Sequence, residues 1–153
     1  MSRRFISPAI SLAPLAGRFR RADLVFHGLD HSGPSYEVRV FFNRPGATAD
    51  TPTTEAEGYV ASFYLFGHGG CAGQPGHCDV PESRRPGDVR PPHQLTPATR
   101  WITVTDAVRR ALEAGELTVT VVPIVRSWRP GGAERDPDAE VMALERVSLV
   151  AYD

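Results

Sequence analysis

Hydrophobic and polar residues alternate along several stretches of the chain, with the period of two that is typical of half-buried β-strands. The clearest stretch is residues 36–43, where Tyr36, Val38 and Val40 fall on one face. Turn residues separate this stretch from others of similar character. The strands predicted in this way cover residues 22–29, 36–43, 59–66, 117–125 and 141–151, with a shorter one at 101–104.

One short helix interrupts this pattern. Val108, Ala111 and Leu112 have the i, i+3, i+4 spacing of an apolar helix face. Thr105 and Asp106 would supply the N-cap and an acidic first turn, and Gly115 would end the helix. The sequence therefore predicts a helix over residues 105–114 that packs on a sheet.

Local composition suggests how the strands connect. Residues 31–35 have turn composition, which predicts a hairpin between the strands on either side. The strand at 59–66 is apolar on both faces, which indicates a central position in its sheet. Pro123 interrupts its strand and indicates an edge or a bulge, whereas the polar residues 129–139 are expected to form a loop.

Together these elements predict a mainly all-β fold, an antiparallel β-sandwich or jelly-roll-like structure with one short helix. The chain has 153 residues, 41% of them hydrophobic and 23% charged, which suits one globular domain. We expect this domain to span residues 22–153, after an N-terminal segment of residues 1–21. A long loop rich in Gly, Pro, His and Cys occupies residues 67–97.

The charge balance narrows the range of partners. A formal net charge of -1 lacks the basic footprint expected of a protein that binds nucleic acid or anionic membranes. No apolar run approaches the roughly 20 residues that would span a bilayer. The pair Arg3-Arg4 resembles a twin-arginine export signal, but Pro8 and Pro14 break the apolar stretch behind it. A cytoplasmic location is therefore expected.

The long loop contains three of the five histidines and both cysteines. Imidazole and thiolate donors so close together could hold copper, with zinc as the alternative, although their spacing matches no standard zinc finger. Alternatively, the two cysteines form a disulfide or stay as thiols; as ligands or as a disulfide they would lie close in space. The predicted metal ligands are His68, Cys71, His77, Cys78 and His93.

Two further groups of residues could belong to a site. His27 and His31 could share a metal only if Gly28 or a bend shortens the path between them, and a histidine at a strand end is more often a hydrogen-bonded structural residue. Aromatic side chains border the long loop and could wall a pocket, although aromatic residues on strands more often belong to the core. These are Tyr64, Phe66 and Trp101.

Common catalytic motifs are absent from the sequence. It has no G-x-S-x-G elbow, no phosphate-binding P-loop and no dinucleotide fingerprint. The sequence thus leaves open whether the chain is an enzyme.

Several motifs resemble the C-terminal, KFDV-type domain that follows the copper domain in polyphenol oxidases and bacterial tyrosinase-family proteins. Residues 36–45 look like the K-F-D-V strand that ends in Asn and Pro, and residues 58–63 are similar to the A-G-S-F strand. In the long loop, F-G-H-G-G-C at 66–71, G-H-C-D-V-P at 76–81 and P-H-Q-L-T-P at 92–97 resemble the bacterial type.

The resemblance implies a β-sandwich that packs on a dinuclear copper site and shields it. A type-3 copper centre needs six histidines and this chain has five, so the chain is not the oxidase itself. We therefore expect a free-standing, metal-binding accessory module whose partner is a separately encoded type-3 copper oxidase, which it shields or helps to metallate. The alternatives are a small mononuclear copper or zinc metalloenzyme that uses the His/Cys loop, and a structural domain pinned by a Cys71–Cys78 disulfide.

Overall fold

The computed structural model describes residues 4–15, 18–31, 33–67, 87, 97–129, 132–136 and 141–153. Within them, strands predominate and the only α-helix is short. In chain order the elements are β1 (Phe5–Ile6), β2 (Ile10–Ser11), η1 (Ala13–Leu15), β3 (Arg21–Leu29), β4 (Tyr36–Phe42), η2 (Glu55–Glu57), β5 (Tyr59–Leu65), β6 (Ala98–Thr103), α1 (Thr105–Ala111), η3 (Leu112–Ala114), β7 (Glu116–Leu117), β8 (Val119–Arg129), β9 (Gly132–Asp136) and β10 (Arg146–Tyr152).

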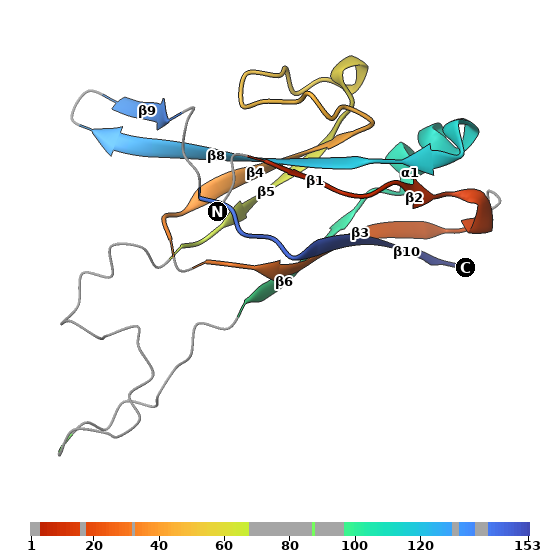
Figure 1. The fold of residues 1–153 in the computed structure, drawn as a ribbon, viewed down its shortest axis with the longest axis horizontal. Coiled ribbons are helices and arrows are strands. Elements are labelled where there is room, and N and C mark those ends of the chain that lie inside the picture. Colours follow the sequence, from red (N-terminus) through yellow and green to blue (C-terminus); the bar gives the residue numbers. More distant parts are fainter. Residues whose placement is uncertain are drawn as a thin grey trace.

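The strands form two layers. A five-stranded sheet has the order β1-β8-β4-β5, with β9 also paired to β8, and a three-stranded sheet has the order β10-β3-β6. The short strands β2 and β7 make a separate pair. Figure 1 shows β3, β6 and β10 as one layer below β8, β4 and β5. All of these pairings are antiparallel, which confirms the predicted fold class.

The main apolar core lies between the two sheets. Phe26 of β3 meets Phe63 of β5 across the layers, with ring centroids 5.1 Å apart. Burying a side chain of this kind stabilises the fold by roughly 1.5–3 kcal/mol. The core also includes the buried residues Leu24, Leu29, Val38, Val40, Leu65, Val119 and Val121.

The predicted helix is present as α1 followed by η3. Val108 is fully buried, and Gly115, with φ 71°, ends the helical stretch in the left-handed conformation that favours glycine. The predicted N-cap is wrong, because Val104 occupies that position and Thr105 is the first helical residue. The Thr105 hydroxyl instead accepts a hydrogen bond of 3.0 Å from the backbone N–H of Ala22, which ties the helix to β3.

Residues before Ala22 contribute to the sandwich. Strand β1 pairs with β8, and β2 pairs with β7. Leu12 and Phe19 are both buried in the main core. The segment set apart in the sequence as residues 1–21 thus supplies strands and core side chains.

The predicted hairpin across residues 31–35 is wrong. Strand β3 belongs to the three-stranded sheet and β4 to the five-stranded sheet, so the chain crosses between layers here. Turn composition signals a change of direction, but it does not choose the strand's partner. The partners come from distant parts of the chain, since β3 pairs with β10 and β6 whereas β4 pairs with β8 and β5.

Strand β5 was predicted to be central in its sheet, and this prediction is wrong. In the described part of the chain it pairs only with β4, at one end of the sheet. The pairing of β5 with β4 shifts register after Val40, and Tyr59 packs edge-on against Phe41 of the outward face, with ring centroids 5.8 Å apart. The outward-pointing Tyr64 of β5 is exposed.

Pro123 lies in a strand that is central overall, but at a locally open position. On one side it pairs with Val38 of β4. On the other side, β1 pairs with residues 120–121 of β8 and β9 with residues 125–129, so Pro123 falls between the two partners. The missing N–H of proline is tolerated there as it would be on an edge strand.

The polar residues 129–139 do not form only a loop. Strand β8 extends to Arg129, which pairs with Gly132, and the two residues between them connect β8 to β9. Strand β9 covers Gly132–Asp136. Such a polar strand lacks the alternation that would reveal it, and it is formed by pairing with β8.

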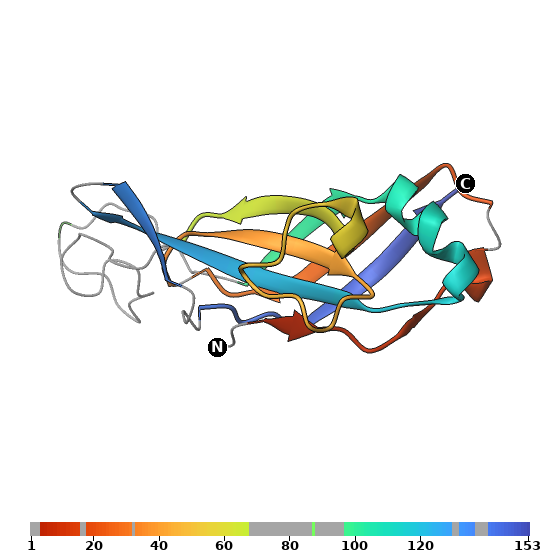
Figure 2. The same cartoon turned by 90° about the horizontal axis from the view of Figure 1, so that it is seen from above.

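A second apolar cluster lies on the outward face of the five-stranded sheet. It contains Phe41, Ala47, Val122 and Ile124. Figure 2, which looks down on this sheet, shows residues 43–58 lying over β4 and β8. This outward face is therefore covered by the protein's own chain.

Candidate functional site at the base of the 67–97 segment

Both ends of the segment that carries the predicted metal ligands are fixed at one end of the sandwich. Strand β5 enters it from Leu65, which pairs with Tyr36, and β6 leaves it at Ala98, which pairs with Leu29. The backbone N–H of Gly67 donates a hydrogen bond of 2.9 Å to the Ser35 hydroxyl. The connection between β3 and β4 therefore forms the base from which the segment departs.

Gly67 fits this base because it has no side chain. A Cβ at this position would collide with the carbonyl oxygen of Gly33 and with the backbone of Pro34. Any other residue would push the chain away from the 33–35 turn and weaken the hydrogen bond to Ser35. The first residue of the segment is thus packed backbone to backbone against the sandwich.

The predicted metal ligands themselves lie outside the described residues. They are His68, Cys71, His77, Cys78 and His93. Metal binding by this segment stays a prediction, and so does the choice between ligation and a Cys71–Cys78 disulfide. In the part of the chain that the structure describes, no three His, Cys, Asp or Glu residues gather as a metal site would require.

His27 has a structural partner. Its Nε2 lies 2.8 Å from the Ser148 hydroxyl of β10, in a hydrogen bond whose direction depends on the histidine tautomer. Gly28 has φ 69° and the pairing of β3 with β6 shifts register there, but shared ligation of a metal by His27 and His31 stays a prediction. A Cβ on Gly28 would also collide with the side chain of Glu145.

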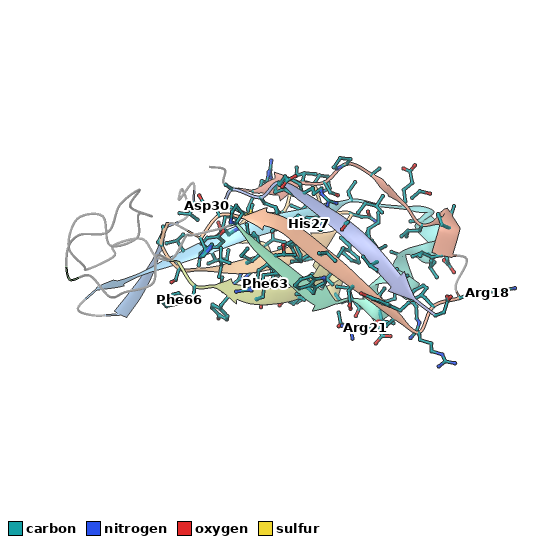
Figure 3. All side chains as sticks on the ribbon, turned by 90° about the horizontal axis from the view of Figure 1, so that it is seen from below. Arg18, Arg21, His27, Asp30, Phe63 and Phe66 are labelled. Atoms are coloured by element: carbon teal, nitrogen blue, oxygen red, sulfur yellow. The ribbon has the colours of Figure 1, made fainter. Side chains whose placement is uncertain are left out.

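Tyr36 is the most unusual polar residue at this base, and sequence patterns did not indicate it as a site residue. It is 3% exposed, and its buried hydroxyl has no hydrogen-bond partner among the residues that the structure describes. Burial raises the pKa of Tyr36 to about 12, and the nearby carboxylate of Asp30 acts in the same direction. Asp30 lies at the end of β3, on the same side of the molecule as Phe66 (Figure 3). Asp30 and Tyr36 lie on either side of the short connection between β3 and β4.

The three predicted pocket aromatics are all largely exposed. Tyr64 is 74%, Phe66 73% and Trp101 58% exposed. Tyr64 pairs with Glu37 on the outward face of the five-stranded sheet. Trp101 pairs with Val25 on the outward face of the three-stranded sheet. Tyr64 and Trp101 therefore point away from opposite layers, and the described residues do not bring them together into one wall.

An ion pair between the exposed Arg21 and the buried Asp23 lies on the outward face of the three-stranded sheet. The Arg21 guanidinium binds both carboxylate oxygens of Asp23, at 2.9 and 2.8 Å, although Asp23 is only 2% exposed. The hydrogen bond from Arg21 lowers the pKa of Asp23 against the effect of burial, and the Thr103 side chain adds to the lowering. Asp23 is therefore ionised, and the guanidinium of Arg21 balances its negative charge.

Among the described residues, no helix is long and apolar enough to cross a bilayer.

The chain is a mainly antiparallel β-sandwich module with a fixed base for a long His- and Cys-containing segment. No family model matches it. No curated protein matches it either.

Two solved structures are similar in shape to this chain. One is a recombinantly expressed latent aurone synthase, a polyphenol oxidase, with a TM-score of 0.46 and 15% identity over 100% of this chain and 25% of that one. The other is the same type of enzyme co-crystallised with hexatungstotellurate(VI) and soaked in H2O2, with a TM-score of 0.42 and 17% identity over 98% of this chain and 24% of that one. This chain thus spans about a quarter of the length of either protein. At these values the likeness is too low to decide function.

Proposed function

We propose that this chain is a metal-binding accessory module, related to the C-terminal domain of tyrosinase-type copper oxidases, that shields or helps to metallate a partner oxidase. It would bind copper, with zinc as the alternative, through residues of the 67–97 segment. The partner would be a separately encoded type-3 copper oxidase.

One structural observation carries this proposal. The sandwich fixes both ends of the 67–97 segment at one base, through the pairing of Leu65 with Tyr36 and of Ala98 with Leu29. A long chain segment loses less entropy on closing around a metal when its ends are already fixed. Three histidines and both cysteines of the chain lie between those ends.

The sequence supplies the second support. The loop motifs at 66–71, 76–81 and 92–97 resemble those of the bacterial tyrosinase-type domain. The chain has five histidines, one fewer than a type-3 copper centre needs, so an accessory role suits it better than oxidation by itself. The alternative, a small free-standing metalloenzyme, would need a substrate pocket. Tyr64 and Trp101 do not form one wall of such a pocket, because they point away from opposite layers.

Elemental analysis of the purified chain tests metal binding. We expect about one copper or zinc ion per chain, lost in a His68→Ala, His77→Ala double variant. His27→Ala is the matched control, because that ring already pairs with Ser148 and should not alter the metal content. Since the ligands must be deprotonated, affinity should fall as the pH drops through about 6.5. A double variant with wild-type metal content and wild-type protease resistance between residues 79 and 97 would show that the metal site is wrongly assigned.

The accessory role needs a separate experiment with the oxidase. A separately encoded type-3 copper oxidase would be purified with and without this chain, and its copper content and its activity on a phenol would be measured. A metallating role raises the copper content, and a shielding role lowers the activity of the fully loaded enzyme. An oxidase in which neither quantity changes contradicts the accessory role and leaves the metal-binding result intact.

A further inference from the structure

Strand β5 forms one margin of the five-stranded sheet (Figure 2), and among the residues that the structure describes it pairs only with β4. Alternate backbone N–H and C=O groups of an antiparallel edge strand point away from its neighbour and can pair with another strand. The two most exposed large hydrophobic side chains of the described residues lie at the end of this margin, Tyr64 at 74% and Phe66 at 73%. Strand β5 therefore offers both backbone groups and apolar surface.

This margin also lacks the protection that edge strands of soluble proteins have. Charged residues, proline or a very short strand usually prevent an edge from pairing with another chain. Residues 59–66 contain no charged residue, no proline and no glycine. On the adjacent strand, Glu37 and Arg39 form an ion pair at 2.9 Å and so balance each other. Two copies of this edge would therefore meet without like charges side by side.

The other edges of the two large sheets differ from β5 in this respect. Strand β1 has only two residues, whereas the remaining edge strands are longer and contain charged residues. These charged residues are Arg100 in β6, Arg146 in β10, and Glu134, Arg135 and Asp136 in β9. Among the described strands, the unprotected edge is thus that of β5.

A small hollow lies beside the start of β5, between this strand and α1. Its volume is about 180 Å³, and its apolar lining includes Phe42, Val60 and Ala111. Arg110 and Glu55, which pair at 3.0 Å, also line it and supply its polar groups. An apolar cavity of about 150 Å³ is enough to bind benzene, so the hollow has room for one phenyl ring.

Antiparallel pairing of two copies of β5 brings the exposed Phe66 to this hollow. When the pairing is centred on Ser62, each Ser62 lies opposite its own copy, and Phe66 lies opposite Gly58 of the second copy, which lines the hollow. The same register places Tyr64 opposite Val60, and aromatic side chains paired with β-branched ones stabilise neighbouring strands. A two-fold axis repeats each of these contacts, so the edge is complementary to itself.

From these observations we infer that the edge of strand β5, residues 59–66, is a self-association surface on which a second copy of this chain pairs antiparallel, with Phe66 of each copy seated in the hollow beside Gly58 of the other. This inference does not depend on metal binding or on an oxidase. One short strand from each copy makes a small interface, and interfaces below about 1,200 Å² are typically weak. We expect a dimer with a dissociation constant on the order of 100 μM.

Sedimentation velocity of the full chain from about 5 to about 500 μM tests this surface, because the dimer fraction should rise across that range. Ser62→Lys would place two ammonium groups opposite each other at the centre of the pairing and should abolish the dimer. Phe66→Ala should raise the dissociation constant by at least about tenfold. The matched controls lie on the other layer: Val150→Lys adds a charge at an exposed strand position, and Trp101→Ala removes an exposed aromatic ring. Both controls should dimerise like the wild type.

A crosslink tests the register of the pairing. Residues directly opposite each other in antiparallel strands have Cα atoms about 4.5–5.5 Å apart, which suits a disulfide. Mild oxidation of Ser62→Cys should therefore join position 62 of one copy to position 62 of the other. Peptide mapping distinguishes this bridge from any that the native Cys71 and Cys78 make. Val150→Cys is the control and should give no bridge between the two copies of position 150.

Several outcomes would overturn the inference. A wild type that stays monomeric up to about 500 μM contradicts it. A dimer that survives both Ser62→Lys and Phe66→Ala is held by another surface, and one without the crosslink at position 62 has another register. Oligomers that grow beyond the dimer also contradict it, because a two-fold pairing is closed. Circular dichroism shows whether each variant is folded, and Phe66→Ala keeps the test decisive if Ser62→Lys unfolds, since Phe66 is exposed and follows the end of β5.

Discussion

Replacing Tyr36 by phenylalanine should stabilise this protein. The Tyr36 hydroxyl is buried in the main core, where no other described residue hydrogen-bonds to it, a situation that costs roughly 1–3 kcal/mol. Phenylalanine keeps the ring and its packing against the core but removes the unsatisfied oxygen. We expect the free energy of unfolding at pH 8 to rise by about 1 kcal/mol, which corresponds to a Tm increase of roughly 2–4 °C for a chain of this size.

The same substitution should change the response to alkaline pH. The folded protein holds the Tyr36 proton up to a pKa of about 12, whereas the unfolded chain releases it near 10.0. Between these values the unfolded state of the wild type gains stability by ionising, so the folded state is lost progressively as the pH rises. Two pKa units correspond to about 2–3 kcal/mol, which Tyr36→Phe would not lose. Its advantage over wild type should therefore grow steadily above pH 10.

Urea unfolding from pH 8 to 11.5 measures both effects. Tyr64→Phe is the control, because its exposed hydroxyl should give no stability difference at either end of this range. The reasoning is refuted if Tyr36→Phe is less stable than wild type by more than about 1 kcal/mol at pH 8. That result would mean that the Tyr36 hydroxyl has a buried partner, such as a water molecule bridging it to Asp30.

Two other substitutions test the packing of Gly67 at the base of the 67–97 segment and the ion pair between Arg21 and Asp23. Gly67→Ala should lower the stability by roughly 1–3 kcal/mol in thermal unfolding, because its Cβ would meet the Gly33 carbonyl, and a larger loss than in Ser35→Ala is expected since that variant removes only the hydrogen bond. If Gly67→Ala and Ser35→Ala lost the same stability, the predicted collision of the Cβ with the Gly33 carbonyl would be wrong. The ionised Asp23 beside Arg21 stabilises the folded state above the ordinary carboxyl pKa near 3.8, and this contribution should disappear as the pH falls through the lowered folded value. Asp23→Asn should lack this acid-dependent loss, and identical acid unfolding curves would contradict the pair's role.

Period-two alternation was sufficient to find strands whose two faces differ in environment. Residues 36–43 are the clearest case, because the inward Val38 and Val40 meet the core along the whole of β4. Alternation alone could not show which strands pair with one another. The turn at 31–35 suits a hairpin as well as a crossing between layers, and the choice depends on which strands from distant parts of the chain occupy each sheet.

The sequence could predict only those parts of the candidate site whose residue types suggest a chemical role by themselves. Histidines and cysteines mark the 67–97 segment, but the base that fixes its ends depends on the pairing of Leu29 with Ala98 and of Tyr36 with Leu65. The burial that raises the pKa of Tyr36 likewise arises only when the two sheets pack together. A tyrosine in an alternating strand carries no sign of an unsatisfied hydroxyl.

Strand β6 links the proposed metal segment to an exposed tryptophan, Trp101. This strand begins at Ala98, directly after the segment, and presents Trp101 three residues later on the outward face. Three residues of extended strand span about 10 Å. A partner docked on Trp101 would thus lie close to the point where the segment rejoins the sandwich, within reach of a metal delivered from it. Metal transfer to the oxidase is therefore expected to slow in Trp101→Ala, whereas the metal content of the isolated chain should not change. A Trp101→Ala variant that transfers copper at the wild-type rate would show that the oxidase does not approach the segment along β6.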